Sequence, residues 1–222
     1  MSMPRASAVT FRLHGRSRRT TAVVALLHGG IGTARPTARW QDPAYLRMLP
    51  FVPTVLTAGR GRVAVAVVRH AQHGWLRQGD GTWDGSDVQP GGALEHLLDG
   101  LSEVVPDGGS LHLVGHSSGG WAAIRALSDA RVSSILGLAP YVAPREPLPT
   151  RQDARVVIAH GAMDSVTSAR DSRAYVQRLV RAGIDAEFHD VSRGDHAMML
   201  NAAAWQAIVH RYVGSCVSGT NR

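Results

Sequence analysis

The sequence contains no lysine, only one cysteine and no long apolar run. All 24 basic residues are therefore arginine, and they are scattered along the chain rather than gathered with aromatic residues in one segment. This distribution argues against a nucleic-acid partner, because such proteins concentrate basic residues on one face. Cys216 stands alone, so no intrachain disulfide can form. No stretch approaches the roughly 20 apolar residues of a membrane-spanning helix, and we expect no membrane partner.

The chain is long enough to bury one sizeable core. Its 222 residues are 44% hydrophobic, and we expect a single domain over 1–222 with its core at about 7–213. Arg18 and Arg19 precede the apolar run 21–27, an order that is similar to a twin-arginine export signal. However, the run is short and no small-residue cleavage site follows it. We therefore predict a buried strand there and a cytoplasmic protein.

Short apolar runs alternate with helical patterns along the chain. Unbroken runs typical of strands buried on both faces of a sheet occur at 21–27, 63–68, 111–114, 134–139 and 155–159. We also predict an edge strand and a last strand, at 7–13 and 186–191.

Three helical patterns lie between these runs. They are an apolar stripe over 94–105, a capping-box start at Ser168 with a glycine stop at Gly183, and a four-residue repeat over 200–212. The alternation of strands and helices predicts a doubly wound α/β domain, with a mostly parallel sheet and helices on both faces. In such a domain, ligands bind beyond the carboxyl ends of the strands.

The segment "GHSSG" at 115–119 has the form G-x-S-x-G and lies between an apolar run and a helical pattern. This strand–turn–helix context is that of a nucleophile elbow, in which a sharp turn holds the serine oxygen above the sheet. Ser117 is therefore the predicted nucleophile, and a glycine-rich turn with a serine cap is the alternative. The amide of Ser118, at the start of the helix, is predicted to face a developing oxyanion.

A serine nucleophile needs a general base, and the base needs a carboxylate that orients it. His196 follows the last predicted strand and is the candidate base. Asp164 follows the preceding predicted strand and is the candidate carboxylate. Asp190 is a weaker option, and Asp195 is adjacent to the histidine, so its side chain should point elsewhere.

A second oxyanion donor is expected in "LLHGGIG" at 26–32, which follows an early strand. The amide of Gly30 is the favoured donor, and that of Ile31 is the alternative. His28 and His116 flank the predicted site, and we expect them to hold loops in place.

Four segments together resemble the α/β hydrolases, in particular small serine esterases and dienelactone-hydrolase-like enzymes without a lid: "HGG" at 28–30, "GHSSGG" at 115–120, "HGAMDSVT" at 160–167 and "GDHAMML" at 194–200. The resemblance spans roughly residues 7 to 213 and includes the family's chain order of serine, aspartate and histidine. It implies the α/β-hydrolase fold and hydrolysis through an acyl-enzyme, without a metal or an organic cofactor.

Two features depart from relatives in this family. Dienelactone hydrolases proper usually have a cysteine nucleophile, whereas this chain has Ser117. Many lipases and thioesterases carry a cap before the acidic residue, but the corresponding stretch, 140–153, is short and contains four prolines. We therefore expect no cap domain, a fairly open site and a substrate of modest size.

The long connection 69–92 follows a strand and is expected to overhang the edge that carries the site. We predict an apolar acyl pocket, with core packing as the alternative for its members: Ile31, Trp75, Trp83, Trp121, Met163 and Met198. The predicted function is a serine hydrolase whose partner is a small-molecule acyl substrate: a carboxylic ester, lactone or thioester. Acyl transfer by the same residues and ligand binding without turnover remain alternatives. The oligomeric state has no signal in the sequence.

Overall fold

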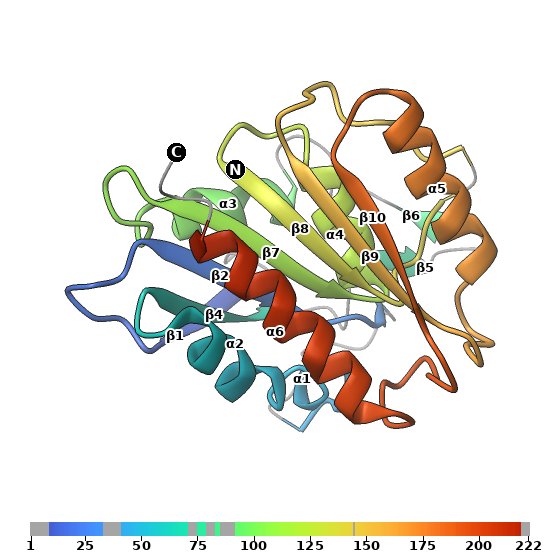
Figure 1. Cartoon of the computed structure of the whole chain (residues 1–222), viewed down its shortest axis with the longest axis horizontal. Coiled ribbons are helices and arrows are strands. Elements are labelled where there is room, and N and C mark those ends of the chain that lie inside the picture. The colour runs from blue at the N-terminus through green and yellow to red at the C-terminus, as the bar shows by residue number, and fades with distance from the viewer. Residues whose placement is uncertain are drawn as a thin grey trace, which may run out of the picture.

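The computed structural model describes residues 9–32, 41–70, 75–78, 83–84, 92–143 and 145–218. Its main sheet has seven strands in the order β1-β4-β2-β7-β8-β9-β10 (Figure 1). The strands are β1 (Val9–His14), β2 (Ala22–Leu27), β4 (Val63–His70), β7 (Ser110–His116), β8 (Val132–Leu138), β9 (Arg155–Gly161) and β10 (Ala186–Val191). All neighbours pair in parallel except β1, which is antiparallel to β4. The predicted strands and the mostly parallel sheet are confirmed.

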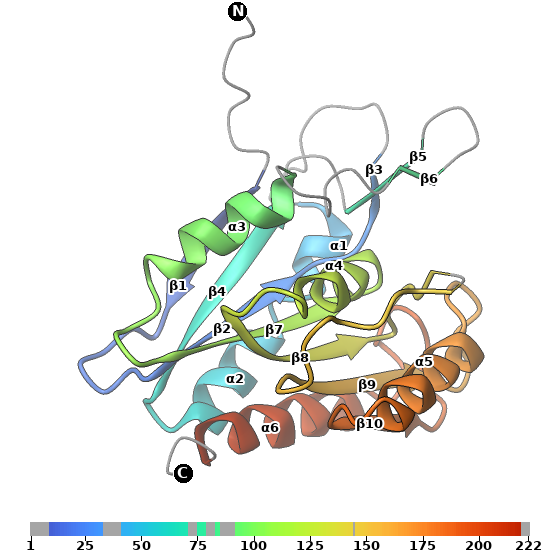
Figure 2. The same cartoon turned by 90° about the horizontal axis from the view of Figure 1, so that it is seen from above.

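Helices cover both faces of this sheet, as predicted (Figure 2). One face packs against α2 and α6, and the other against α3, α4 and α5. The helices are α1 (Pro43–Leu46), α2 (Phe51–Gly59), α3 (Ala93–Ser102), α4 (Ser118–Ala126), α5 (Ala169–Arg181) and α6 (Ala202–Ser218). Two separate apolar clusters result, one on each side of the sheet.

Local sequence explains several of these elements. Every residue of β2 is buried, because this strand lies in the sheet interior with helices on both sides. The hydroxyl of Ser168 accepts a hydrogen bond from the Asp171 amide at 3.1 Å and caps α5. Gly183 follows Ala182, the C-cap residue of α5, and has φ of 80°, so it provides the predicted left-handed stop.

Other elements differ from the prediction. Helices α1 and α2 were not predicted, nor was a small second sheet of β3 (Ile31–Gly32), β5 (Leu76–Gln78) and β6 (Trp83–Asp84). The last helix was predicted from Leu200, but α6 begins at Ala202 and Leu200 is half exposed. Asn201 has φ of 53°, and this left-handed residue separates Leu200 from the helix.

The connection from β8 to β9 is short and has no helix or strand in its described residues, 139–143 and 145–154. The predicted absence of a cap domain is therefore confirmed at this place in the fold. Within the described part of the chain, no helix combines the length and apolar character needed to cross a membrane.

Candidate active site

Ser117 occupies a strained turn between β7 and α4. Its φ and ψ are 55° and −121°, a backbone conformation that non-glycine residues rarely adopt. The amide of Ser117 donates to the Leu138 carbonyl at 3.1 Å. Its carbonyl accepts from the amides of Trp121 at 3.1 Å and Tyr141 at 3.0 Å. These hydrogen bonds fix the turn from both neighbouring segments.

Glycines next to the turn permit a close approach of backbones. A Cβ at Gly115 would lie 2.2 Å from the carbonyl oxygen of Gly119. A Cβ at Gly119 would lie 2.5 Å from the carbonyl oxygens of Leu27 and His28. Helix α4 can therefore begin directly over the ends of β2 and β7 only because both residues lack side chains.

Three loops that follow parallel strands bring together the serine, histidine and aspartate that the sequence indicated. Ser117 follows β7, Asp164 follows β9 and His196 follows β10, and these strands end at the same edge of the sheet (Figure 1). His196 Nε2 lies 3.2 Å from Ser117 Oγ, and His196 Nδ1 lies 2.8 Å from Asp164 Oδ2. The Asp164 side chain is fully buried, whereas that of His196 is 17% exposed. The hydroxyl can therefore pass its proton to an imidazole that a buried carboxylate orients.

Hydrogen bonds keep the buried Asp164 carboxyl ionised. Its Oδ1 accepts the amides of Val166 at 2.8 Å and Thr167 at 3.0 Å. Its Oδ2 lies 2.9 Å from the Thr167 hydroxyl and 3.2 Å from Nε2 of His160. Burial alone would raise the pKa of Asp164, but hydrogen bonds from His160, His196 and the two amides hold it well below its usual range.

The two alternative carboxylates have other partners. Asp190 forms an ion pair with Arg173, and both side chains are about half exposed. Asp195 accepts hydrogen bonds from the amides of Met199 at 2.9 Å and Leu200 at 2.8 Å. Of the three candidate carboxylates, Asp164 is the one that contacts His196, so it is the one that orients this imidazole.

Two hydrogen bonds hold the loop after β2. The Ser118 hydroxyl donates to the Gly30 carbonyl at 2.6 Å, and His28 Nδ1 lies 2.6 Å from the Gly29 carbonyl oxygen. Gly30 has φ of 121°, which favours glycine. Within the described residues, the amides of Gly30 and Ser118 donate no hydrogen bond to the protein. Their role as oxyanion donors stays a prediction, as does that of Ile31 as the alternative donor.

His116 holds the loop that carries His196. Its Nε2 lies 2.8 Å from the His196 carbonyl oxygen and donates to it. Burial, together with the neighbouring His196, lowers the pKa of His116 to about 3. The ring is therefore neutral at neutral pH, and it contributes a hydrogen bond without adding a charge beside Ser117.

The residues predicted to line an acyl pocket lie in different surroundings. Trp75, Trp121 and Met198 are buried among core residues, which favours the packing alternative for all three. Trp121 also donates from Nε1 to a Glu146 carboxylate oxygen at 2.7 Å. Met163, by contrast, is 59% exposed on the Asp164 loop. The side chains of Ile31 and Trp83 lie outside the described residues.

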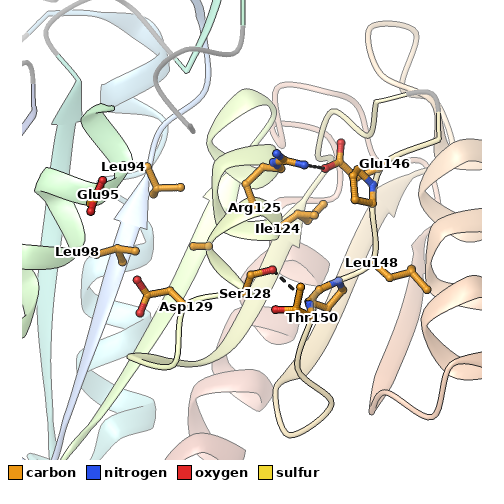
Figure 3. A pocket seen from close by; sticks show the side chains of 13 residues that line it. Leu94, Glu95, Leu98, Ile124, Arg125, Ser128, Asp129, Glu146, Leu148 and Thr150 are labelled. Carbon is orange, nitrogen blue, oxygen red and sulfur yellow. Dashed lines mark hydrogen bonds and ion pairs between the residues drawn. The ribbon is translucent and has the colours of Figure 1, made fainter. Parts of the chain in front are cut away.

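A pocket of about 480 Å³ lies between α3, α4 and the segment 146–150 (Figure 3). Leu94, Leu98 and Leu148 contribute to its apolar wall, and Arg125 pairs with the buried Glu146 at its rim. None of Ser117, Asp164 and His196 lines this pocket, so it is separate from the candidate active site.

The sequence analysis missed two neighbours of Asp164, His160 and Thr167, and it missed Ser172, which contacts His160. The segment "HGAMDSVT" contains the first two, so their proximity in sequence was a usable signal. Ser172 lies in α5, and nothing local indicates that its side chain faces the end of β9. Within the described residues, no cluster of three or more histidine, cysteine, aspartate or glutamate side chains could hold a metal ion.

Neither the family models nor the curated proteins gave a match to this chain. Solved structures did, at low sequence identity. Est1E from Butyrivibrio proteoclasticus with bound ferulic acid is 13% identical, with a TM-score of 0.66 and coverage of 95% of this chain and 96% of that one. A monoacylglycerol lipase of Paleococcus ferrophilus is 14% identical, with a TM-score of 0.65 and coverage of 94% and 99%.

A serine hydrolase homologue from Coxiella burnetii is 17% identical, with a TM-score of 0.60 and coverage of 92% of this chain and 91% of that one. All three similar structures match over nine-tenths or more of both chains, with TM-scores of 0.60 to 0.66. The chain therefore has the α/β-hydrolase fold.

Proposed function

We propose that this protein is a serine hydrolase that cleaves a carboxylic ester, lactone or thioester through an acyl-enzyme on Ser117. The observation that carries the proposal is the hydrogen-bonded series Ser117, His196 and Asp164, with the serine in a strained turn at the carboxyl edge of the sheet. Esterases and a lipase among the similar structures support the same class of reaction.

The first half-reaction forms the acyl-enzyme. His196 Nε2 accepts the proton of Ser117 as its Oγ attacks the substrate carbonyl carbon. The negative charge that develops on the carbonyl oxygen is stabilised by the amides of Gly30 and Ser118. Collapse of the tetrahedral intermediate expels the alcohol or thiol, which takes the proton from His196. Asp164 stabilises the imidazolium throughout and remains ionised.

The second half-reaction regenerates the serine. His196 removes a proton from water, whose oxygen attacks the acyl carbon bound to Ser117. The same two amides stabilise the second oxyanion, and the proton returns to the serine oxygen as the acid leaves. Acyl transfer replaces water with another alcohol or an amine, so product analysis with an added nucleophile separates hydrolysis from transfer.

Exposed apolar side chains support a substrate with an apolar group. The loops of Asp164 and His196 carry four large hydrophobic side chains that are at least half exposed: Met163, Val166, Met199 and Leu200. Two of these, Met163 and Leu200, also line a pocket of about 430 Å³ with Arg193. Apolar atoms exposed next to a reactive centre commonly mark a binding surface. We therefore infer that an apolar part of the ester contacts this rim.

The test is turnover of p-nitrophenyl esters of increasing acyl length by the wild type and by Ser117→Ala. We expect the wild type to hydrolyse at least one ester, and the variant to lose at least about 10³-fold in rate while its circular dichroism is unchanged. Full activity in Ser117→Ala would show that another residue attacks the ester and would refute the proposal.

A further inference from the structure

A second imidazole, besides that of His196, contacts Asp164. His160, the next-to-last residue of β9, has a fully buried side chain whose Nε2 lies 3.2 Å from Asp164 Oδ2. The same oxygen lies 2.8 Å from Nδ1 of His196. His160 Nδ1 lies 3.0 Å from the hydroxyl of Ser172, which is also buried. The proposed mechanism uses neither His160 nor Ser172.

The direction of these hydrogen bonds follows from the groups available. An ionised Asp164 can only accept, so Nε2 of His160 carries the proton that points at Oδ2. In a neutral imidazole the other nitrogen is then an acceptor, and the Ser172 hydroxyl is the donor within reach. Ser172 thus selects the tautomer of His160, and His160 in turn orients the carboxylate.

We propose that His160 and Ser172 are positioning residues, which hold the Asp164 carboxylate in the orientation that His196 needs. The inference rests on the proposed function, because it assigns the pair a role in the same triad. Since His160 and His196 donate to one oxygen, His160 also limits how strongly Asp164 stabilises a proton on His196. Removing His160 should therefore let His196 keep its proton to higher pH.

Among the described residues, few other ionisable groups surround this carboxylate. Asp164 is faced by His160 on β9, by His196 from the loop after β10 and by His116 at the end of β7. Helix α5 contributes the neutral hydroxyl of Ser172. Burial lowers the pKa of His116 to about 3, so His116 does not titrate in the range where an esterase is assayed.

The experiment compares His160→Leu, His160→Gln and Ser172→Ala with the wild type. Glutamine keeps an N–H group near the place of Nε2, whereas leucine removes it. Each protein is assayed for the rate of labelling by a fluorophosphonate probe, and for kcat and KM on the best ester across a range of pH.

We expect His160→Leu to lose roughly tenfold to a hundredfold in labelling rate and kcat, well short of the ~10⁴-fold loss that follows when the triad carboxylate no longer orients its histidine. KM should change little, and the acid limb of the kcat/KM profile should move to higher pH. His160→Gln should recover most of the rate, and Ser172→Ala should be intermediate.

Three outcomes would overturn the positioning role. The first is unchanged labelling, kcat and acid limb in both His160→Leu and Ser172→Ala. The second is a loss that glutamine does not restore and that leaves the acid limb in place, which would indicate a structural role. In the third, the wild type itself is not labelled, so the proposed function fails and this inference fails with it. If His160→Leu does not fold, the other two variants decide in the same way.

Discussion

At the scale of single residues, one hydroxyl connects the two amides of the proposed oxyanion hole. The Ser118 side chain donates to the Gly30 carbonyl at 2.6 Å, while the amide of Ser118 is itself one of the two proposed donors. The carbonyl of Gly29 is held separately by the ring of His28. The loop after β2 is therefore fixed relative to α4 before any substrate arrives, which is what electrostatic stabilisation of an oxyanion requires.

Ser118→Ala removes this connection but keeps both amides. We expect kcat on an ester to fall about tenfold, less than the 10²–10³-fold loss that follows removal of a donor, and KM to change little. The matched control is Ser128→Ala, an exposed serine just beyond the other end of α4, which should leave both constants unchanged. If the Ser118→Ala enzyme keeps the kcat of the wild type, other contacts hold the loop after β2.

The three proposed catalytic residues were predictable because each lies in a turn or loop that follows a strand expected from the sequence. The role of His160 was not predicted, although His160 lies close to Asp164 in the sequence, because its contact with Ser172 depends on how α5 packs on β9. The predicted acyl pocket shows the same limit. Trp75 could not be distinguished from a pocket residue by composition, yet the fold buries it completely against His70.

At the scale of elements, the close approach of α4 to β7 determines whether the elbow can form. The Cβ of an alanine at Gly115 would meet the backbone of Gly119 at 2.2 Å. Backbone atoms cannot rotate away as a flexible side chain can, so the helix itself would have to move.

Gly115→Ala should therefore destabilise the protein by about 3 kcal/mol or more and abolish esterase activity. Gly214→Ala is the matched control, because Gly214 lies inside α6 with no atom within 4 Å of an added Cβ. That change should raise the free energy of unfolding by about 0.5–1 kcal/mol, because alanine favours the helix. Denaturant unfolding measures both values, and a Gly115→Ala protein as stable as the wild type would contradict the described packing.

The sheet was predictable from the sequence, whereas α2 was not. Buried parallel strands appear as unbroken apolar runs, and every run gave a strand. Helix α2 contains Pro53 and several β-branched residues, which have low helix propensity. Its apolar residues pack with those of α6 in the same core cluster, and Thr54 donates to Gln206 of α6 at 2.5 Å. This helix therefore depends on contacts between segments about 150 residues apart, which no local pattern encodes.

At the scale of the whole molecule, a buried polar cluster joins the sheet to α6. His112 in β7 contacts the hydroxyls of Ser110 and Ser134, both at 2.8 Å. The Ser134 hydroxyl also lies 2.7 Å from that of Tyr212 in α6. Burial lowers the pKa of His112 to about 4, so the folded protein keeps this ring neutral at pH values where the unfolded chain protonates it.

The lowered pKa of His112 makes the stability of the folded protein depend on pH. Between the ordinary histidine pKa of about 6.5 and the native value of about 4, the unfolded state binds a proton that the folded state does not. The free energy of unfolding should therefore fall as the pH decreases through this range, by up to about 1.4 kcal/mol per pH unit from His112. His112→Gln should show a shallower slope, and the exposed His210→Gln should keep the wild-type slope. Equal slopes in all three proteins would contradict a neutral, buried His112.

The central claim, that Ser117 is an activated nucleophile, has one direct measurement. The folded wild type is treated with a fluorophosphonate, and the adduct is located by mass spectrometry of its peptides. We expect a single adduct on Ser117, absent from Ser117→Ala and from wild-type protein unfolded before treatment. If the wild type gains no adduct, or if Ser117→Ala is labelled as well as the wild type, Ser117 is not the activated nucleophile.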